Sequence, residues 1–395
     1  MKKCIALLIG LISCVIFIYA GAWDNILMGT RALSMATAFA AVADDPSAIF
    51  YNPAGLTFQT HSINLSLEGI YIMPKHSYTF PSGTTVYSKL KNYYPQAFIS
   101  IKRDRWSFGF GVFCPYGGGG VDWSKQDLGY PLKAILGIYS FTPSIAYKFS
   151  EKFSAGVNFS IYKGKMEVET ENLLYGPMSV NETGTSYTAG FGILYRPTKK
   201  IGIGLNFRGP AKMKIEGDTK IMGMSFASES KFNLPYSIEF GISYHIKENF
   251  LISADMDYSH WSSLKKLEGR IKDVPVAPGI TMDIDKSEII NYKNIIKFKM
   301  GTEYVFSNGV AIRGGVAYDN YARPDETLNL MDIDVDKIVL FGGIGYRAGK
   351  VELNFAGVYA LGKEREISTI YGGYPVTQKF NLNATIISLG IRYSY

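Results

Sequence analysis

The sequence predicts an all-β transmembrane barrel of fourteen antiparallel strands, with an N-terminal helical segment held inside the lumen as a hatch. Three observations lead to this fold class. A leader for secretion opens the chain, apolar and polar residues alternate from about residue 61 onward, and short connections alternate with long ones.

Residues 1–22 are predicted to be a secretory signal peptide. Two lysines precede an apolar run, and small residues close it just before Trp23, where we expect cleavage. An uncleaved membrane anchor and lipoprotein processing at Cys14 are the alternatives. Without the leader only Cys114 remains, so no intrachain disulfide can form and a large core or a membrane must stabilise the fold.

The composition narrows the class of protein. The chain has 41 basic and 34 acidic residues, an excess too small and too dispersed for nucleic-acid binding. It contains 28 Tyr, 24 Phe and 41 Gly, and no second stretch long enough for a transmembrane helix. For a secreted chain this combination indicates a barrel in the outer membrane of a Gram-negative cell.

A period of two, typical of strands, runs through residues 61–395. Near the C-terminus, Ile387, Leu389 and Ile391 share one face, and Ser388 and Arg392 share the other. The pattern recurs along the chain with Tyr or Phe near the ends of the apolar face, as in the aromatic girdles of membrane barrels. The expected strands are 61–73, 92–102, 105–115, 134–148, 152–166, 184–196, 200–213, 231–246, 249–260, 294–306, 310–322, 337–347, 350–361 and 384–395.

The connections between these strands alternate strictly in length. The short ones are expected to be periplasmic turns, and the long ones extracellular loops at 74–91, 116–133, 167–183, 214–230, 261–293, 323–336 and 362–383. A soluble sandwich has no reason to keep this alternation. Tyr395 ends the chain on the apolar face, where we expect the barrel-assembly machinery to recognise it, and we expect a monomer.

Residues 23–60 are not strand-like and are expected to form the hatch. A fourteen-stranded barrel has a lumen that leaks unless something fills it. Six alanines between Arg31 and Ala43 predict a helix that lies close to the barrel wall. A periplasmic helical appendage is the alternative.

Two acidic residues, Asp44 and Asp45, are expected to end that helix. The pair formed by Asp45 and Pro46 suits an N-cap followed by a first helical position, and Asn52 with Pro53 repeats this arrangement. Short helical turns are therefore expected to complete the hatch.

The stretch GTRALSMATAFAAVADDPSAIFYNPAGL resembles the hatch segment of the FadL family of outer-membrane transporters for long-chain fatty acids and other hydrophobic compounds. The matching residues include Asp44, Asp45, Asn52, Pro53 and Ala54. Two further stretches resemble the family: GFGVFCPYG with SFTPSIAYKFSEKFSAGVNFSIY, and DMDYSHWSSLKKL.

The resemblance covers essentially the whole chain after the leader. It implies a fourteen-stranded barrel, an internal hatch and passive uptake. In such proteins the ligand lands in an apolar groove among the outer loops, moves to a pocket in the lumen, and leaves sideways through an opening at a kinked third strand.

The third strand has residues that suit such a kink: Gly109, Gly111 and Pro115. Proline cannot donate to the ladder, and glycine weakens it. Alternatively, Pro115 and the glycines after it simply form an extracellular loop.

A fatty-acid carboxylate buried in the lumen would need a basic partner. Lys297 and Arg313 are the first candidates because they face inward on neighbouring strands, and Lys299 is the third. Ordinary charge ladders across the lumen are the alternative, and an uncharged ligand such as an aromatic hydrocarbon would need no basic residue.

Aromatic residues in the long loops could build the outer groove. Tyr116, Trp123 and Tyr130 are the main candidates. They could equally pack against one another or touch lipopolysaccharide and other outer-membrane lipid.

Three other classes of function compete with transport of hydrophobic compounds. One of them, a structural or adhesive barrel, would show no ligand binding. An outer-membrane enzyme would use His260, which follows Asp257, but one such pair is weak evidence. A general porin would lack the helical plug. No catalytic residue, metal or cofactor is expected.

Overall fold

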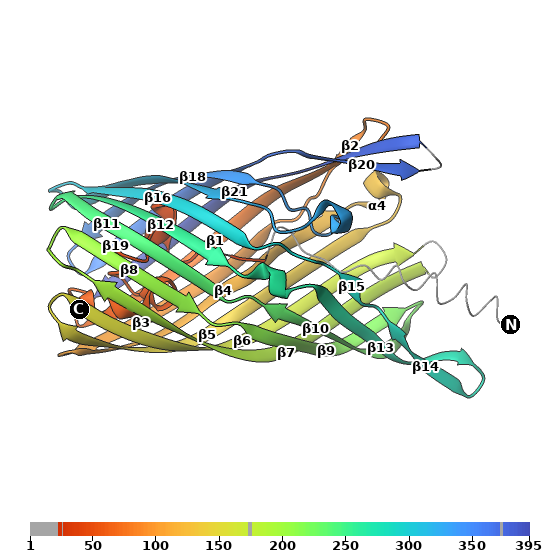
Figure 1. Cartoon of the computed structure of the whole chain (residues 1–395), viewed down its shortest axis with the longest axis horizontal. Coiled ribbons are helices and arrows are strands. Elements are labelled where there is room, and N and C mark those ends of the chain that lie inside the picture. The colour runs from red at the N-terminus through yellow and green to blue at the C-terminus, as the bar shows by residue number, and fades with distance from the viewer. Residues whose placement is uncertain (1–22, 26, 173–175, 372–373) are drawn as a thin grey trace.

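The computed structural model describes residues 23–25, 27–172, 176–371 and 374–395. The signal peptide and Cys14 lie outside these residues and stay predictions. Within the described residues the chain forms a closed antiparallel barrel of fourteen strand positions. The ring closes because β1 (Ile63–Thr79) pairs with β3 on one side and with the last strand, β21, on the other (Figure 1).

The wall strands follow the predicted order. Three positions each contain two consecutive strands separated by a short break. In ring order the wall consists of β1, β3 (Asn92–Arg103), β4 (Trp106–Trp123), β5 (Leu132–Ser150), β6 (Phe153–Asn172), β7 (Gly176–Tyr195), β8 with β9 (Ile201–Arg208, Ala211–Ile221), β11 with β10 (Ser237–Lys247, Met224–Leu234), β12 with β13 (Phe250–Ser259, Lys266–Ala277), β16 (Ile295–Val305), β17 (Val310–Asp319), β18 (Lys337–Ala348), β19 (Val351–Gly362) and β21 (Tyr374–Ser394).

The remaining strands and the small helices lie at the extracellular end or in the hatch. The short turns and the C-terminus gather at the opposite, periplasmic end (Figure 1). The additional strands are β2 (Thr85–Tyr87), β14 (Ile280–Asp285), β15 (Glu288–Ile289) and β20 (Arg365–Tyr371), and the extracellular helices are α4 (Lys125–Leu128), η2 (Trp261–Ser263) and η3 (Asp325–Thr327).

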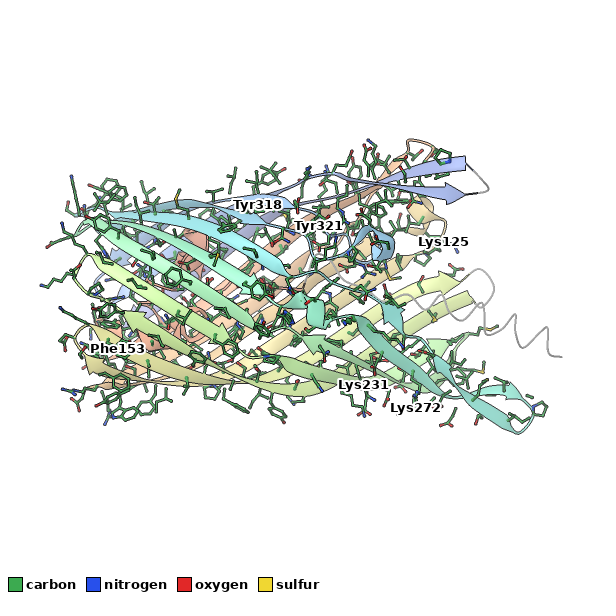
Figure 2. All side chains as sticks on the ribbon, viewed as in Figure 1. Lys125, Phe153, Lys231, Lys272, Tyr318 and Tyr321 are labelled. Carbon is green, nitrogen blue, oxygen red and sulfur yellow. The ribbon has the colours of Figure 1, made fainter. Side chains whose placement is uncertain are left out.

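Burial along the wall is inverted relative to a soluble protein. On β16, Lys297 is 2% exposed, whereas its neighbour Phe298 is 55% exposed. Apolar side chains project outward around the barrel, with Phe153 near the periplasmic end, while Lys231, Lys272 and Lys125 lie beyond Tyr318 toward the extracellular end (Figure 2). The predicted alternation of lipid-facing and lumen-facing residues is therefore confirmed. Among the described residues, no helix is long and apolar enough to cross a membrane.

Several predicted loops are in fact strand. Segments 167–183 and 214–230 continue β6, β7, β9 and β10 beyond the membrane, apart from residues 173–175, which lie outside the described part. These segments were predicted to be loops because the outer face of each strand changes from apolar to polar along its length. Above the lipid, Lys212 and Lys214 face water while Met213 faces inward, so the outer face stops being apolar although the ladder continues.

The hatch lies inside the barrel but is less helical than predicted. The expected helix is reduced to α2 (Thr30–Ser34), because Ala36 and Thr37 adopt positive φ of 55° and 57°. The backbone turns there toward the wall, where the Ala40 amide donates to Asp255 Oδ2 at 2.8 Å. Two short elements follow: α3 (Ala48–Tyr51) and the 3₁₀ helix η1 (Pro53–Phe58).

Glycines in the wall let the hatch backbone come close. A Cβ on Gly301 would lie 2.1 Å from the Met35 carbonyl oxygen, and one on Gly204 would lie 2.1 Å from the Ala40 oxygen. No side chain fits at these positions while the hatch is seated. The hatch is therefore fitted to this wall.

Candidate functional site

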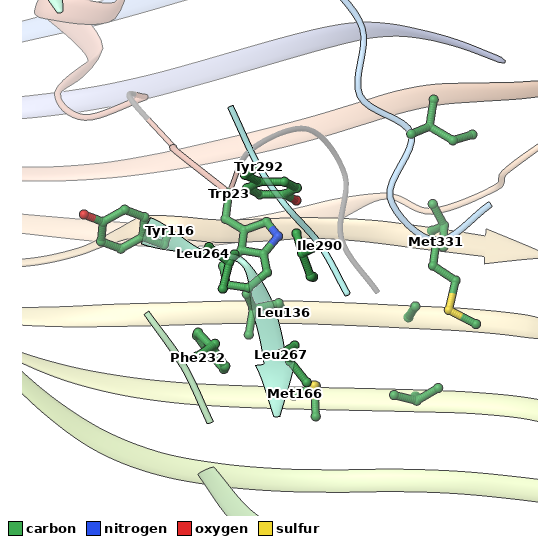
Figure 3. Packing of buried hydrophobic residues seen from close by; sticks show 14 of the residues in the cluster. Trp23, Tyr116, Leu136, Met166, Phe232, Leu264, Leu267, Ile290, Tyr292 and Met331 are labelled. Carbon is green, nitrogen blue, oxygen red and sulfur yellow. The ribbon is translucent and has the colours of Figure 1, made fainter. Parts of the chain in front are cut away.

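The extracellular half of the lumen contains a large apolar cluster, called here the mouth cluster. Trp23 lies at its centre, with ring centroids 5.0 Å from Phe232, 5.6 Å from Trp261 and 6.1 Å from Tyr292 (Figure 3). Residues from six or more wall strands join it, among them Leu136, Met166, Leu264, Leu267 and Met331. The first residue after the expected cleavage site thus anchors the hatch in an apolar lumen.

The predicted groove aromatics belong to this interior and do not form an open groove. Tyr116 and Trp123 are buried in the mouth cluster, and Tyr130 packs against it. They are positioned by β4, in which residues 113–116 are all buried, and by the loop that follows it.

The segment between β17 and β18, residues 320–336, folds over the mouth. Trp123 Nε1 donates to the Leu330 carbonyl at 2.9 Å. Arg323 pairs with Asp332 at 2.6 Å, and the Tyr292 hydroxyl donates to Asp332 at 2.5 Å. Burial outweighs the attraction of Arg323 and raises the pKa of Asp332 to about 7.

A cavity of about 190 Å³ lies below the mouth, between the hatch and the wall. Its lining is mostly apolar and comes from β1, β16, β17, β18, β19, β21 and the hatch. The glycine stretch of β4, residues 117–120, forms another part of its boundary. The main apolar lining residues are Leu27, Ile72, Val339, Phe341, Leu382 and Ile386.

A small polar group interrupts this lining. His76 is 1% exposed, and neither ring nitrogen has a hydrogen-bond partner among the described residues. Lys337 Nζ lies 3.5 Å from Asp319, and Lys297 Nζ lies 3.1 Å from Asp24. A buried imidazole without partners is costly. The cavity thus offers unused hydrogen-bonding capacity beside two ammonium groups.

The wall is incomplete next to this cavity. The ladder between β3 and β4 ends at the pair Ala97 and Val112, and β4 shifts register twice above it. There β4 pairs with the hatch: the Asn25 amide donates to the Pro115 oxygen at 2.9 Å, and the Gly117 amide donates to the Trp23 oxygen at 2.7 Å.

The three residues proposed for the kink have different roles. Pro115 lies within the displaced part of β4. Gly109 and Gly111 lie below it, in regular pairing with β3. A Cβ on Gly109 would meet Ile49 of the hatch at 2.9 Å, so this glycine makes room for the hatch.

The three basic candidates do not form one site. Lys297 lines the cavity, Lys299 pairs with Glu239, and Arg313 lies near the periplasmic end, bonded to Glu303 at 2.5 Å. The strands that contain Lys297 and Arg313 are neighbours but antiparallel. Lys297 is opposite Asp319 and Arg313 is opposite Glu303, so the two bases lie at different levels.

The charged residues of the periplasmic half hold the hatch. Arg31 pairs with Glu303 at 2.8 Å and with Asp44 at 2.5 Å. Asp45 accepts from the Ser47 amide at 2.9 Å and so supports the turn before α3, whose N-cap is Ser47. Asp44 is thus an ion-pair partner and does not end a helix.

Asn52 is the N-cap predicted before Pro53, since its side chain accepts from the Ala54 amide at 3.2 Å. Its Nδ2 also donates to the Ala40 oxygen at 2.8 Å and to the wall at Ile193. The Asn-Pro-Ala turn is therefore a fastening point between hatch and barrel.

His260, the candidate for catalysis, contacts two tyrosines of the wall. Its ring stacks on Tyr236 with centroids 4.8 Å apart, and its Nδ1 lies 3.1 Å from the Tyr258 hydroxyl. Within the described ranges, no three His, Cys, Asp or Glu side chains gather as metal ligands would.

Two cavity residues escaped the sequence analysis although a signal existed. His76 lies on the lumen face of β1, which the period of two would have shown if the strand had been continued past residue 73. Lys337 begins β18 on the face opposite Ile338. Trp23 had no periodic signal, because the hatch has no regular repeat.

Comparison with known proteins gives a consistent picture. A family model described as outer membrane protein transport protein (OMPP1/FadL/TodX) matches residues 19–395. The long-chain fatty acid transport protein of Escherichia coli is 24% identical over 361 residues, covering 78% of each chain. Outer membrane protein P1 of Haemophilus influenzae is 21% identical, covering 90% of this chain and 91% of the relative.

Solved structures show the same fold. A FadL homologue from Pseudomonas aeruginosa superimposes with a TM-score of 0.82 at 18% identity, covering 95% of this chain and all of the other. The toluene transporter TbuX of Ralstonia pickettii gives a TM-score of 0.72 at 18% identity, covering 93% of this chain and 98% of the other.

Proposed function

The chain belongs to the OMPP1/FadL/TodX family, as an outer-membrane transporter of hydrophobic compounds, and we propose that its cargo is a hydrophobic acid, above all a long-chain fatty acid. Transport is passive, and the protein is not an enzyme. The observation that carries this proposal is the cavity that combines apolar walls with His76, Lys337 and Lys297.

The chemistry of this cavity favours an amphiphile. Each methylene placed against the apolar lining contributes about 0.8 kcal/mol, so a long alkyl chain binds well without any polar contact. The carboxylate of such a chain needs donors in a buried site. His76 has unused ring nitrogens. The ammonium groups of Lys337 and Lys297 line the same cavity, and each has further N–H donors besides its ion pair with Asp319 or Asp24.

The route follows from the order of the parts. The ligand enters between the loops that cover the mouth, crosses the mouth cluster, and settles in the cavity. It leaves sideways where the ladder between β3 and β4 ends, near Pro115. Displacement of Trp23 and Asn25, which pair with β4 at this point, opens the way.

An aromatic hydrocarbon is the second candidate cargo. The ring-rich mouth cluster favours it, and toluene transporters share the fold. Such a ligand would not use His76 or Lys337.

Competition between ligands tests the proposal. Purified protein is titrated with oleate, oleyl alcohol and toluene, and binding is followed by calorimetry. We expect oleate to bind at least about tenfold more tightly than the alcohol, equivalent to about 1.4 kcal/mol. The double substitution His76→Leu with Lys337→Met should abolish this preference, and Lys379→Met on the extracellular surface is the control. Equal affinity for acid and alcohol in the wild type would refute a hydrophobic acid as cargo.

A further inference from the structure

The periplasmic end of the barrel has a concentration of basic residues that movement of ligand through the upper lumen does not require. The short connections at this end are exposed and contain fewer acidic than basic side chains. The acidic ones are Asp104, Glu151 and Glu248. The basic ones around the rim include Arg103, Arg105, Lys152, Lys200, Lys247 and Lys350.

A hollow of about 470 Å³ opens inside this rim. The hatch forms its floor through Val42 and Asp44, and the ends of the wall strands form its sides. Three carboxylates line it: Asp44, Glu303 and Glu352. Its cationic side chains, which define what we call the basic bowl, are Arg31, Arg196, Lys199, Arg313, Arg347 and Arg392.

The basic bowl has cationic capacity that its own carboxylates do not use. Arg196 donates to the Val42 carbonyl at 2.8 Å and lies over the Phe58 ring, and no carboxylate among the described residues lies within 4.0 Å of it. Lys199 is exposed and likewise has no ion-pair partner in the described part of the chain. Arg392 pairs with Glu352 and lies 3.6 Å from Asp45, although its buried Nε has no hydrogen-bond partner there. The cationic charge that the described carboxylates leave unpaired is therefore that of Arg196 and of the exposed Lys199.

We propose that the basic bowl is a docking site for an acidic segment of a soluble periplasmic protein. Its charge is complementary to a run of Asp or Glu side chains. Its cations come from the β7–β8 turn, from the nearby strands β17, β18 and β21, and from the hatch. A linear segment with several carboxylates can reach both parts of the rim. Head groups of the inner leaflet surround the outer wall and cannot reach the centre of the bowl.

A segment docked in the basic bowl would contact the hatch, which forms the floor of the bowl. Arg31 connects the hatch to the wall through Glu303 and pairs with Asp44 within the hatch, and these groups line the same hollow. A docked carboxylate contacts the element that closes the lumen, so the partner is placed where it can affect the hatch. The inference needs only the periplasmic orientation of the short turns and is independent of the cargo.

The test uses the full chain in lipid nanodiscs and a fluorescein-labelled peptide of ten glutamates, with a peptide of ten glutamines as the neutral probe. Anisotropy should show saturable binding of the acidic peptide only, weakening several-fold between about 20 and 150 mM salt. The double substitution Lys199→Gln with Arg347→Gln should weaken binding at least tenfold. A matched pair on the extracellular extension, Lys214→Gln with Lys231→Gln, should leave it unchanged.

Several results would overturn the proposal. These are equal binding of the two peptides, no loss in the rim variant, or an equal loss in the extracellular control. Competition by inorganic phosphate at the same concentrations as by the peptide would indicate a small-anion site instead. Preferential binding of phosphatidylglycerol vesicles over the peptide would indicate lipid. If the double variant does not fold, the single exposed substitution Lys199→Glu must still weaken peptide binding.

Discussion

The two halves of the lumen are built from opposite chemistry. In the extracellular half, the buried side chains are mostly aromatic and aliphatic, with Trp23, the first residue of the hatch, at their centre. Around and below the hatch, they are Arg, Glu, Asp and Asn that bond the hatch to the wall. Apolar contacts are not directional and can be exchanged for those of a ligand. Buried ion pairs are directional, and breaking one leaves an uncompensated charge.

This difference explains how one barrel can admit a ligand without leaking. In the upper half, apolar contacts between side chains can be replaced by contacts with the ligand. In the lower half, ion pairs and hydrogen bonds keep the hatch fixed to the wall. Substitutions in the lower half should therefore open a leak without abolishing ligand binding, and substitutions in the upper half should do the reverse.

The largest effect is expected at Arg31. Arg31→Met leaves Glu303 and Asp44 with one fewer partner, and breaking a buried pair costs about 3–5 kcal/mol. The hatch should loosen, so conductance in planar bilayers should rise while oleate binding persists. Arg347→Met is the matched control, since Arg347 also meets a buried glutamate but is half exposed, and its loss should cost at most about 1 kcal/mol. Similar conductance for the Arg31 and Arg347 variants would contradict the idea that the buried ion pairs of Arg31 keep the hatch closed.

A somewhat smaller effect is expected from crowding the hatch. In Gly301→Val the new side chain would meet the Met35 carbonyl, and overpacking typically costs about 1–3 kcal/mol. The barrel should still migrate as a folded species on gels, but protease should cleave the hatch. At Gly342 a Cβ meets nothing within 4 Å, so Gly342→Val should leave the hatch protected. A protected hatch in the Gly301 variant would contradict the close fit.

In the upper half, Phe232→Ala should weaken ligand binding without opening a leak. Phe232 packs edge-on against Trp23, and the residues that follow Trp23, Asp24 and Asn25, line the cavity. Loss of the Phe232 ring therefore loosens the end of the hatch that bounds the ligand site. We expect oleate affinity to fall about tenfold, or about 1.4 kcal/mol, with no change in conductance. If this variant leaked but kept its affinity for oleate, the upper half would be needed for closure of the lumen and not for ligand binding, which contradicts the proposed roles.

The smallest effect is a pH dependence of segment 320–336. The folded-state pKa of Asp332 is raised above its ordinary value, to about 7, so its protonated form favours the closed segment. That contribution is present at low pH and is lost as the pH rises through about 7. A spin label on Glu326→Cys should therefore be more mobile at about pH 8.5 than at about pH 5.5.

The control for this pH effect is Asp332→Asn, which should keep the label immobile at both pH values. Arg323, Glu288, Tyr292 and Asp334 are the other charged or titratable groups packed around Asp332. A pH response that persists in the asparagine variant would assign the effect to one of them.

The fold could be predicted almost completely from the sequence, because lipid on one side and the lumen on the other impose a period of two. Lys297 beside Phe298 is a clear example of this inversion. The prediction was wrong where that contrast disappears, as in the extracellular parts of β9 and β10, where water replaces lipid outside.

The hatch and the site were less predictable for a different reason. The alanines after Arg31 favour a helix locally, but the wall offers Asp255 and close glycines that stabilise a turned backbone instead. The cavity depends on register between distant strands, which brings His76 of β1 near Lys337 of β18. The recognition of Tyr395 by the assembly machinery and the monomeric state stay predictions.

A crystal structure with 2-bromohexadecanoate would show where the head group of a fatty acid binds, because the bromine lies beside the carboxyl carbon. We expect an anomalous peak in the cavity, with the carboxylate within about 3 Å of His76 or Lys337 and the alkyl chain along the apolar lining. An ordered fatty acid found elsewhere in the lumen, with this cavity empty, would contradict this expectation.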